Sequence, residues 1–402
     1  MSPRVVVTGL GPVSSIGVGV SAFAEALRRG RSGVSRITSF DPTGFPYVNA
    51  CEVKDFAPER VLRRLEVTRW GRSSQFAASA ARLAVDDAGL ADDAVPADRV
   101  AVVIGTTSGE SQVVEALTAE LVAGGYAGMS GRLWDQVPAG RLSEAASEEL
   151  AAEGQSVTLT TACSASNYAL GYAYDCLVDG EADVVVAGGA DSVCRWAHAG
   201  FYRLGALTDE LCRPFDAHRT GILTAEGGVA LVLETLAHAR ARGARIYAEM
   251  LGYGMNCDAH HPVAPDEQSI AECMRLAHRN AGIKPEDVDY ICAHGTGTPS
   301  NDLAEGLAVH EVFGDRPPPI SSVKSMLGHA MGAASGFGAV ASVLAIARGF
   351  LPPTVNWSTV DPQLPWLDPV PNVCRPHGVR IAQNNGYAFG GNNAITIFGR
   401  LP

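Results

Sequence analysis

Short runs of apolar residues alternate with longer alanine-rich segments along the chain. Residues 99–105 and 182–191 are apolar nearly throughout, which predicts strands buried on both faces of a sheet. Residues 69–89 carry alanines, Phe76 and Leu83 at helical spacing and are predicted to form a long helix. This order of strands and helices is typical of an α/β protein.

The pattern occurs twice. Residues 245–254 open the second half with a strand and glycines, as residues 4–11 open the first, and residues 287–298 parallel residues 99–109. A repeat of this kind predicts a duplicated α/β unit. We place its N-terminal half at residues 1–243 and its C-terminal half at 244–402, without a flexible Pro/Ser/Gly linker between them.

One cysteine lies where a strand is expected to meet a core helix. Residues 157–161 are largely β-branched and predict a buried strand, and residues 168–178 predict a helix that is apolar nearly all round. Cys163 falls between them, where unpaired N–H groups and the positive end of the helix dipole favour a thiolate. A buried cysteine can also be only a small apolar residue, so this stretch alone leaves both readings open.

Three further reactive side chains occupy matching positions in the second half. His294 ends an apolar strand, Lys324 ends another, and His329 opens the second core helix. Each could be structural by itself, as a capped turn histidine, a solvated lysine or a histidine packed on glycines. The duplication should bring equivalent strand ends to one face, so their joint occurrence with Cys163 favours a single catalytic site.

Composition narrows the possible functions. Of 402 residues, 47% are hydrophobic and 18% charged, which suits a large buried core. The net charge of −12 argues against a nucleic-acid or anionic-membrane partner. We find no signal peptide and no apolar run of about 18 residues, the length of a membrane span. The nine scattered cysteines, without C-x-x-C, favour free thiols in a reducing cytoplasm.

Two other motifs are weak. The glycine-rich turn at residues 9–17 has Ser14 at the third glycine position of a dinucleotide fingerprint and lacks the acidic residue that should follow. Cys257, His260 and His261 lack the spacing of a zinc site, so we predict no metal. The serine-hydrolase and P-loop motifs do not occur in the sequence.

Four motifs together resemble those of the β-ketoacyl-acyl-carrier-protein synthases, the elongating ketosynthases of the thiolase superfamily. Residues 161–166 resemble the nucleophile motif, 294–302 the first histidine motif, 324–329 the lysine–histidine motif and 387–393 the glycine-rich gating loop. The resemblance runs nearly from end to end. It implies a thiolase-like duplicated fold of five layers, α-β-α-β-α.

The resemblance also implies a decarboxylative Claisen condensation. Cys163 would attack an acyl thioester and hold the acyl chain. His294 and His329 would then donate hydrogen bonds to the enolate formed from a malonyl thioester, and Lys324 would tune the field and hold His329 in place. The backbone N–H groups of Cys163 and Phe389 would form the oxyanion hole.

Substrate binding follows from the same resemblance. Thr296 and Thr298 match hydroxyls for the pantetheine arm, and Phe389 matches a gating aromatic. No cofactor is expected on the enzyme itself, because the phosphopantetheine arm arrives on an acyl carrier protein. Members of this kind are dimeric, so we expect a homodimer or a heterodimer with a chain-length-factor-like subunit.

Three positions depart from the fatty-acid members. Gly338 replaces a glutamate near the lysine, Ala388 replaces a glycine between the two aromatics of the gating loop, and Ser108 aligns where a bulky aliphatic residue often limits chain length. We therefore predict that Ser108 lines a roomier or more polar acyl pocket.

Three classes of function remain open from the sequence, the first of them with two alternatives. A ketosynthase of a specialised type II polyketide pathway is favoured by the departures, and a housekeeping fatty-acid ketosynthase is the alternative. A non-catalytic chain-length-factor-like partner is disfavoured by Cys163, which such subunits typically lack. A thiolase-like enzyme using free coenzyme A is disfavoured by the pair His294 and His329.

Overall fold

The computed structural model describes residues 3–209 and 211–401, and most of its strands form one large mixed sheet. The first half contributes, from the centre outward, β1 (Val5–Ser14), β8 (Gly227–Thr235), β7 (Val184–Asp191), β5 (Val100–Gly105) and β6 (Ser156–Leu159). The second contributes, in the same direction, β9 (Ala248–Cys257), β15 (Asn392–Gly399), β14 (Ile381–Gly386), β10 (Tyr290–Cys292) and β11 (Ile320–Ser321).

The two half-sheets have the same internal order, so the predicted duplication is confirmed. Each half carries two antiparallel pairings near the centre and two parallel pairings toward its edge. They join where Val5–Val7 of β1 pairs antiparallel with residues 248–250 of β9. The exact division of the chain between residues 243 and 244 stays a prediction.

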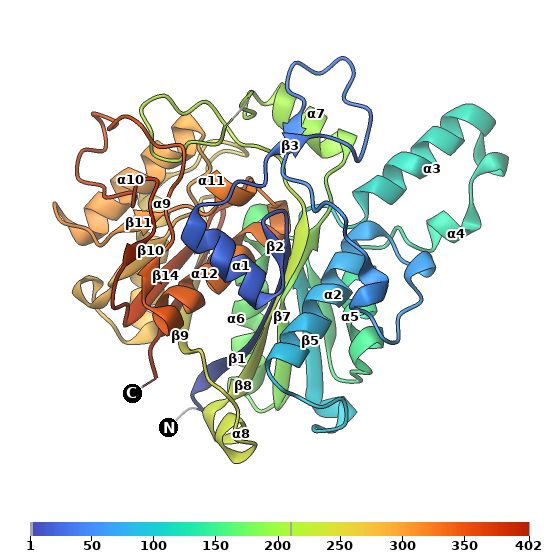
Figure 1. Cartoon of the computed structure of the whole chain (residues 1–402), viewed down its shortest axis with the longest axis horizontal. Helices are drawn as coiled ribbons and strands as arrows, with labels where there is room; N and C mark the ends of the chain where they lie inside the picture. The colour runs from blue at the N-terminus through green and yellow to red at the C-terminus, as the bar shows by residue number, and fades with distance from the viewer. Residues whose placement is uncertain (1–2, 210, 402) are drawn as a thin grey trace.

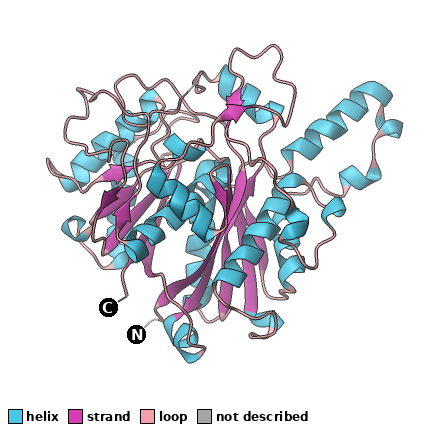
Figure 2. Cartoon of the chain, in the orientation of Figure 1, coloured by secondary structure: helices cyan, strands magenta, loops and turns pink. Residues whose placement is uncertain are grey.

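Helices fill three layers around the half-sheets (Figures 1 and 2). The middle layer holds α6 (Ala165–Val178) and α12 (Ala334–Arg348), which pack on strands of both halves. On the outer face of the first half lie α2 (Arg72–Asp87) and α5 (Arg141–Leu150), and on that of the second lie α9 (Glu267–Ala281) and α10 (Pro299–Phe313). The predicted five-layer arrangement is therefore present.

The remaining elements are short or peripheral. In Figure 1, α3 (Ser111–Gly124) and α4 (Gly131–Trp134) project away from the first half. These elements are β2 (Gly17–Val18), α1 (Val20–Arg29), β3 (Ser35–Arg36), β4 (Asn49–Ala50), α3 (Ser111–Gly124), α4 (Gly131–Trp134), α7 (Arg195–Arg203), α8 (Leu236–Ala241), α11 (Lys324–Leu327), β12 (Phe350–Leu351) and β13 (Arg375–Pro376).

Two predictions from the sequence need correction. The strand before Cys163 is not buried: in β6, Ser156 is exposed and the next three residues are half-buried, because β6 is the edge strand of its half-sheet. The segment Met331–Arg348 is long and apolar enough to cross a membrane, although no apolar run of that length was expected. It is the core helix of the middle layer, with 89% of the window buried inside the protein.

Candidate active site

Cys163 lies on a strained turn at the start of a core helix. A 3₁₀ turn, Ala162–Ser164, leads directly into α6, and Ala162 has a φ of 50°. This left-handed conformation is rare for a residue with a Cβ and occurs where the surrounding structure enforces it. The turn places the thiol, only 5% exposed, between the two halves of the protein.

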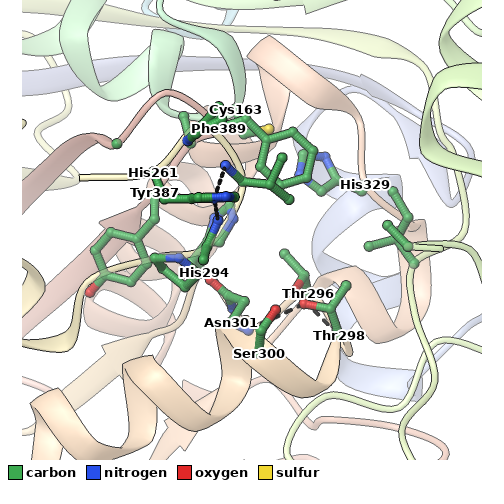
Figure 3. A pocket seen from close by; sticks show the side chains of 18 of the residues that line it. Cys163, His261, His294, Thr296, Thr298, Ser300, Asn301, His329, Tyr387 and Phe389 are labelled. Carbon is green, nitrogen blue, oxygen red and sulfur yellow. Dashed lines mark hydrogen bonds between the residues drawn. The ribbon is translucent and has the colours of Figure 1, made fainter. Parts of the chain in front are cut away.

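A cavity of about 50 Å³ joins Cys163 to the ends of the second half's strands. Figure 3 shows the predicted residues around it, on segments far apart in the sequence. Its lining includes six of the predicted site residues, namely Cys163, His294, Thr296, Thr298, His329 and Phe389. The free volume is close to that of one or two water molecules, so an acyl chain needs side chains to move before it enters.

His329 is a fixed hydrogen-bond donor. Its Nδ1 accepts the backbone N–H of Met331 at 3.0 Å, so the proton of the neutral ring is assigned to Nε2. Burial, together with the charge of Lys324, lowers the pKa of His329 to about 3. The ring is therefore neutral at physiological pH and donates through Nε2–H.

His294 has the same tautomer for a different reason. The ammonium group of Lys324 donates to the backbone carbonyl of His294 and lies 3.4 Å from Nδ1. An ammonium group has only donors, so Nδ1 accepts and Nε2 carries the proton. Burial and the positive charge of Lys324 hold the pKa of His294 well below its usual value. The two imidazole centroids are 5.7 Å apart, with their planes at 85°.

Burial favours the thiol form of the free Cys163, against the thiolate that the helix start favours. Burial raises the pKa of Cys163 to about 11, and the charge of Lys324 opposes this only in part. The backbone N–H groups of Phe389 and Cys163 also lower it by hydrogen bonding to the sulfur. At this helix start, the backbone N–H groups stabilise the Cys163 thiolate by less than its removal from water destabilises it. The same two N–H groups are those predicted for the oxyanion hole, and that role stays a prediction.

The two threonines are held at the cavity by a buried carboxylate. Their hydroxyls lie 2.9 Å apart, and Thr298 caps the N-terminus of α10. Asp302, fully buried in the first turn of this helix, accepts the N–H of Gly297 through both of its oxygens at 3.1 Å. It also accepts the N–H of Phe215 from the first half. Asp302 thus ties the threonine loop to the opposite half of the molecule.

The sequence matches two adjacent family domains. Residues 2–239 match "Beta-ketoacyl synthase, N-terminal domain", and residues 247–358 match "Beta-ketoacyl synthase, C-terminal domain". The chain belongs to the β-ketoacyl synthase family. It is a ketosynthase, an enzyme of the acyltransferase class, with the thiolase-like fold of that family.

Relatives cover the ketosynthase over its whole length. It is 38% identical to 3-oxoacyl-acyl-carrier-protein synthase 2 of Synechocystis sp., with 98% of this chain and 97% of the relative covered. It is 37% identical to Nodulation protein E of Rhizobium meliloti, with 99% of both covered. A solved chain titled as the ishigamide ketosynthase/chain length factor is 50% identical, with a TM-score of 0.98 and full coverage of both chains.

A second solved structure adds a carrier protein. Its title describes a type II PKS acyl-carrier protein in complex with its ketosynthase bound to the hexaketide. The matched chain is 31% identical to this ketosynthase, with a TM-score of 0.92 and full coverage of both chains.

Glu305 supports the loop that carries His294, and it was not predicted from the sequence. Its carboxylate accepts the backbone N–H groups of His294 and Gly295 and the side-chain amide of Asn385, at 2.7–2.9 Å. Burial raises its pKa to about 7. Glu305 lies one helical turn after Asp302 on the buried face of α10, a spacing that is visible in the sequence.

Phe201 was also missed. It lies on α7 of the first half, lines the cavity, and its ring centroid is 6.0 Å from that of Phe389 and 6.2 Å from that of His329. The apolar residues along this partly exposed helix do not indicate that Phe201 packs beside Phe389 and His329, so the sequence alone could not predict it.

Two predicted positions lie outside the cavity lining. Lys324 is buried behind His294 and contacts that residue, whereas the sequence led us to expect it to hold His329. Nδ1 of His329 is instead held by the N–H of Met331. The backbone N–H of Ser108 donates to Asp191, and its hydroxyl lies 3.4 Å from that of Ser111. Its role in an acyl pocket stays a prediction.

At Gly338 the space of a side chain is taken by Asn384, whose Oδ1 lies 2.3 Å from a Cβ built there.

Proposed function

We propose that this ketosynthase condenses an acyl group carried on Cys163 with a malonyl group delivered by an acyl carrier protein, in a specialised type II polyketide pathway. The observation that carries the chemistry is the meeting of one thiol, two Nε2–H donors and two backbone N–H donors at one small cavity. These are the groups that a decarboxylative Claisen condensation requires.

In the first half-reaction, the sulfur of Cys163 attacks the acyl thioester carbonyl. The oxyanion accepts from the N–H groups of Cys163 and Phe389, and its collapse breaks the bond to the pantetheine sulfur. Cys163 starts as a thiol, so its proton ends on the departing pantetheine thiol. Because burial raises the pKa of Cys163 to about 11, we expect this deprotonation to be coupled to substrate binding.

In the second half-reaction, the malonyl carboxylate leaves as CO₂ and its electron pair forms an enolate. His294 and His329 donate Nε2–H to the enolate oxygen and remain neutral, as suits groups that stabilise charge without transferring a proton. The enolate carbon attacks the acyl-cysteine, and the second tetrahedral intermediate expels the Cys163 thiolate, which regains a proton from solvent. The product is a β-ketoacyl thioester.

The enzyme needs no cofactor of its own in this scheme. The phosphopantetheine arm arrives on the acyl carrier protein and extends past Thr296 and Thr298 to reach Cys163. Their hydroxyls can donate to and accept from the amides of the arm. Phe389 and Phe201, which pack together across the cavity, move apart to admit the acyl chain.

The polyketide assignment rests on a higher sequence identity to one solved ketosynthase/chain length factor chain than to a fatty-acid synthase 2 protein. It rests also on the departures from the fatty-acid members at Gly338, Ala388 and Ser108. The chain shares 50% of its residues with the ishigamide ketosynthase/chain length factor chain, against 38% with 3-oxoacyl-acyl-carrier-protein synthase 2 of Synechocystis sp.. We accordingly favour a heterodimer with a chain-length-factor-like subunit over a homodimer. The nine cysteines, all free, fit work in a reducing cytoplasm. Housekeeping fatty-acid elongation is the second candidate, supported by the full-length similarity to the synthase 2 proteins.

Intact-mass measurement with acyl carrier proteins tests the proposal. We expect an acyl adduct on the enzyme that is lost in Cys163→Ala, and release of CO₂ from malonyl carrier protein. An adduct retained in Cys163→Ala would refute the nucleophile, and the absence of both reactions would favour a non-catalytic partner subunit. A polyketide enzyme should accept β-ketoacyl or unsaturated acyl carriers with a kcat/KM at least equal to that for saturated ones. A strong preference for saturated chains would favour fatty-acid elongation.

A further inference from the structure

A second turn, related to the Cys163 turn by the internal duplication, lies beside the active site. The 3₁₀ turn Met331–Ala333 leads into α12, as Ala162–Ser164 leads into α6. Met331 has a φ of 49° and Ala162 a φ of 50°, so the strained residue recurs at the matching place. Gly332 therefore corresponds to Cys163.

The second turn cannot carry a nucleophile. A Cβ built on Gly332 would lie 2.5 Å from the Cα of Thr106 and 2.7 Å from a carboxylate oxygen of Asp191. At this position the chain presents only the backbone N–H of Gly332, which donates to Asp191.

Asp191 is fully buried at the end of β7 and gathers four donors. Its Oδ2 accepts the N–H of Gly332 at 2.7 Å and that of Thr107 at 2.8 Å. Its Oδ1 accepts the hydroxyl of Thr106 at 2.8 Å and the N–H of Ser108 at 3.2 Å. The carboxylate of Asp191 thus accepts the Gly332 N–H of the second turn, as a substrate oxyanion would accept the Cys163 N–H of the first turn.

We propose that Asp191 is a positioning residue of the condensation: by binding the N–H of Gly332, it holds the turn that presents the N–H of Met331 to His329. Met331 immediately precedes Gly332, and its N–H donates to Nδ1 of His329. This contact keeps the proton on Nε2, where the enolate needs it. The inference rests on the role proposed above for His329.

The same turn also braces the nucleophile helix. The hydroxyl of Ser166, in the first turn of α6, donates to the carbonyl of Gly332 at 2.5 Å. Without the carboxylate, the Gly332 N–H would be buried without an acceptor, a cost that favours relaxation of the strained turn. A relaxed turn releases Nδ1 of His329, and the ring can then take the tautomer that has no proton on Nε2.

The test separates the two half-reactions in Asp191→Ala and Asp191→Asn. Glu149→Gln is the control for the loss of a buried carboxylate, because Glu149 is also fully buried and accepts the backbone N–H groups of Arg63, Arg64 and Leu65, and the side chain of Arg82, away from the site. In Asp191→Ala we expect malonyl decarboxylation to fall about 30-fold or more in kcat, with KM unchanged, while acyl transfer to Cys163, which depends on the turn only through the Ser166 contact, falls by a clearly smaller factor. Asp191→Asn, whose amide oxygen still accepts from Gly332, should recover part of the loss.

A spectroscopic readout completes the test and does not depend on turnover. In ¹⁵N-histidine-labelled wild-type enzyme, His329 should show the Nε2–H tautomer, and the Asp191 variants should show a mixture. Equal losses in both half-reactions, or an unchanged His329 tautomer in Asp191→Ala, would overturn the inference. If Asp191→Ala does not fold, equal losses in both half-reactions of Asp191→Asn overturn it. A wild-type enzyme without either half-reaction would refute the proposed function instead, and the tautomer would still report on Asp191.

Discussion

The ammonium nitrogen of Lys324 lies 3.4 Å from Nδ1 of His294 and donates to the backbone carbonyl of the same residue. One buried cation thereby fixes both the position and the tautomer of a ring on another element. The charge also opposes protonation of His294 and His329 and favours ionisation of Cys163. Lys324 therefore acts on every predicted catalytic group without lining the cavity.

Replacement of this lysine should weaken decarboxylation most. In Lys324→Met the chain volume is kept but Nδ1 of His294 loses its donor, so we expect malonyl decarboxylation to fall roughly 100-fold, with a smaller fall in acyl transfer. The measurement is CO₂ release from malonyl carrier protein. Lys284→Met, at an exposed lysine, is the control and should leave both rates unchanged. A loss confined to acyl transfer would contradict the role of Lys324 at His294.

Alkylation should report the protonated state of Cys163. With a pKa of about 11, only a small fraction of the thiol is ionised at neutral pH. The rate of iodoacetamide labelling at Cys163, followed by peptide mass, should therefore rise about tenfold per pH unit between pH 7 and 10. A rate that reaches a plateau below pH 8 would show that the free enzyme holds a thiolate.

Acid should destabilise the fold through the active-site histidines. Burial depresses the pKa of His329 to about 3, below that of an unfolded histidine near 6.5. The unfolded chain therefore binds more protons between these values, so stability is fully present above about pH 6.5 and falls as the pH drops toward 3. Each such histidine contributes at most about 1.4 kcal/mol per pH unit to the free energy of unfolding. Urea unfolding of wild type and His329→Gln should show a shallower acid slope in the variant, and equal slopes would contradict the shift.

Restoring a side chain at position 338 should be costly. A Cβ there would meet Asn384, whose amide also donates to Asn167, Ser335 and Thr396. We expect Gly338→Ala to lower the free energy of unfolding by roughly 1–3 kcal/mol. Gly200→Ala, in α7 with open space around it, should instead raise it by about 0.5–1 kcal/mol. A neutral Gly338→Ala would mean that Asn384 moves freely.

Ser108 provides the test of chain length. Its loop is anchored at Asp191 beside the Cys163 turn, so a bulky side chain there would project into space that an acyl chain needs if it extends past this loop. Ser108→Phe should shorten the acyl chains accepted from a series of carrier proteins, measured by competition and intact mass. Ser108→Ala should leave the distribution unchanged. Unaltered product lengths in Ser108→Phe would remove Ser108 from the acyl pocket.

Apolar runs and their repetition determined the duplicated α/β order and most element positions in advance. Buried strands and core helices depend on local patterns of apolar residues, which are visible in one dimension. The predicted helix over residues 69–89 forms as Arg72–Asp87, and the order of strands in the first half recurs in the second. Cys163, His294 and His329 were also expected at one site, and the cavity brings them together.

Burial and contacts between residues far apart in the chain set the protonation of Cys163 and the tautomers of the two histidines, which the sequence could not predict. The thiol state of Cys163 depends on a balance between desolvation and distant charges, and the helix start by itself pointed the wrong way. The tautomers of the two histidines depend on Met331 and Lys324, and the bracing of the Gly332 turn depends on Asp191, far away in the chain. The sequence by itself determined which reactive groups the ketosynthase has. Only the tertiary structure decided their protonation and direction, because both are set by neighbours that folding supplies.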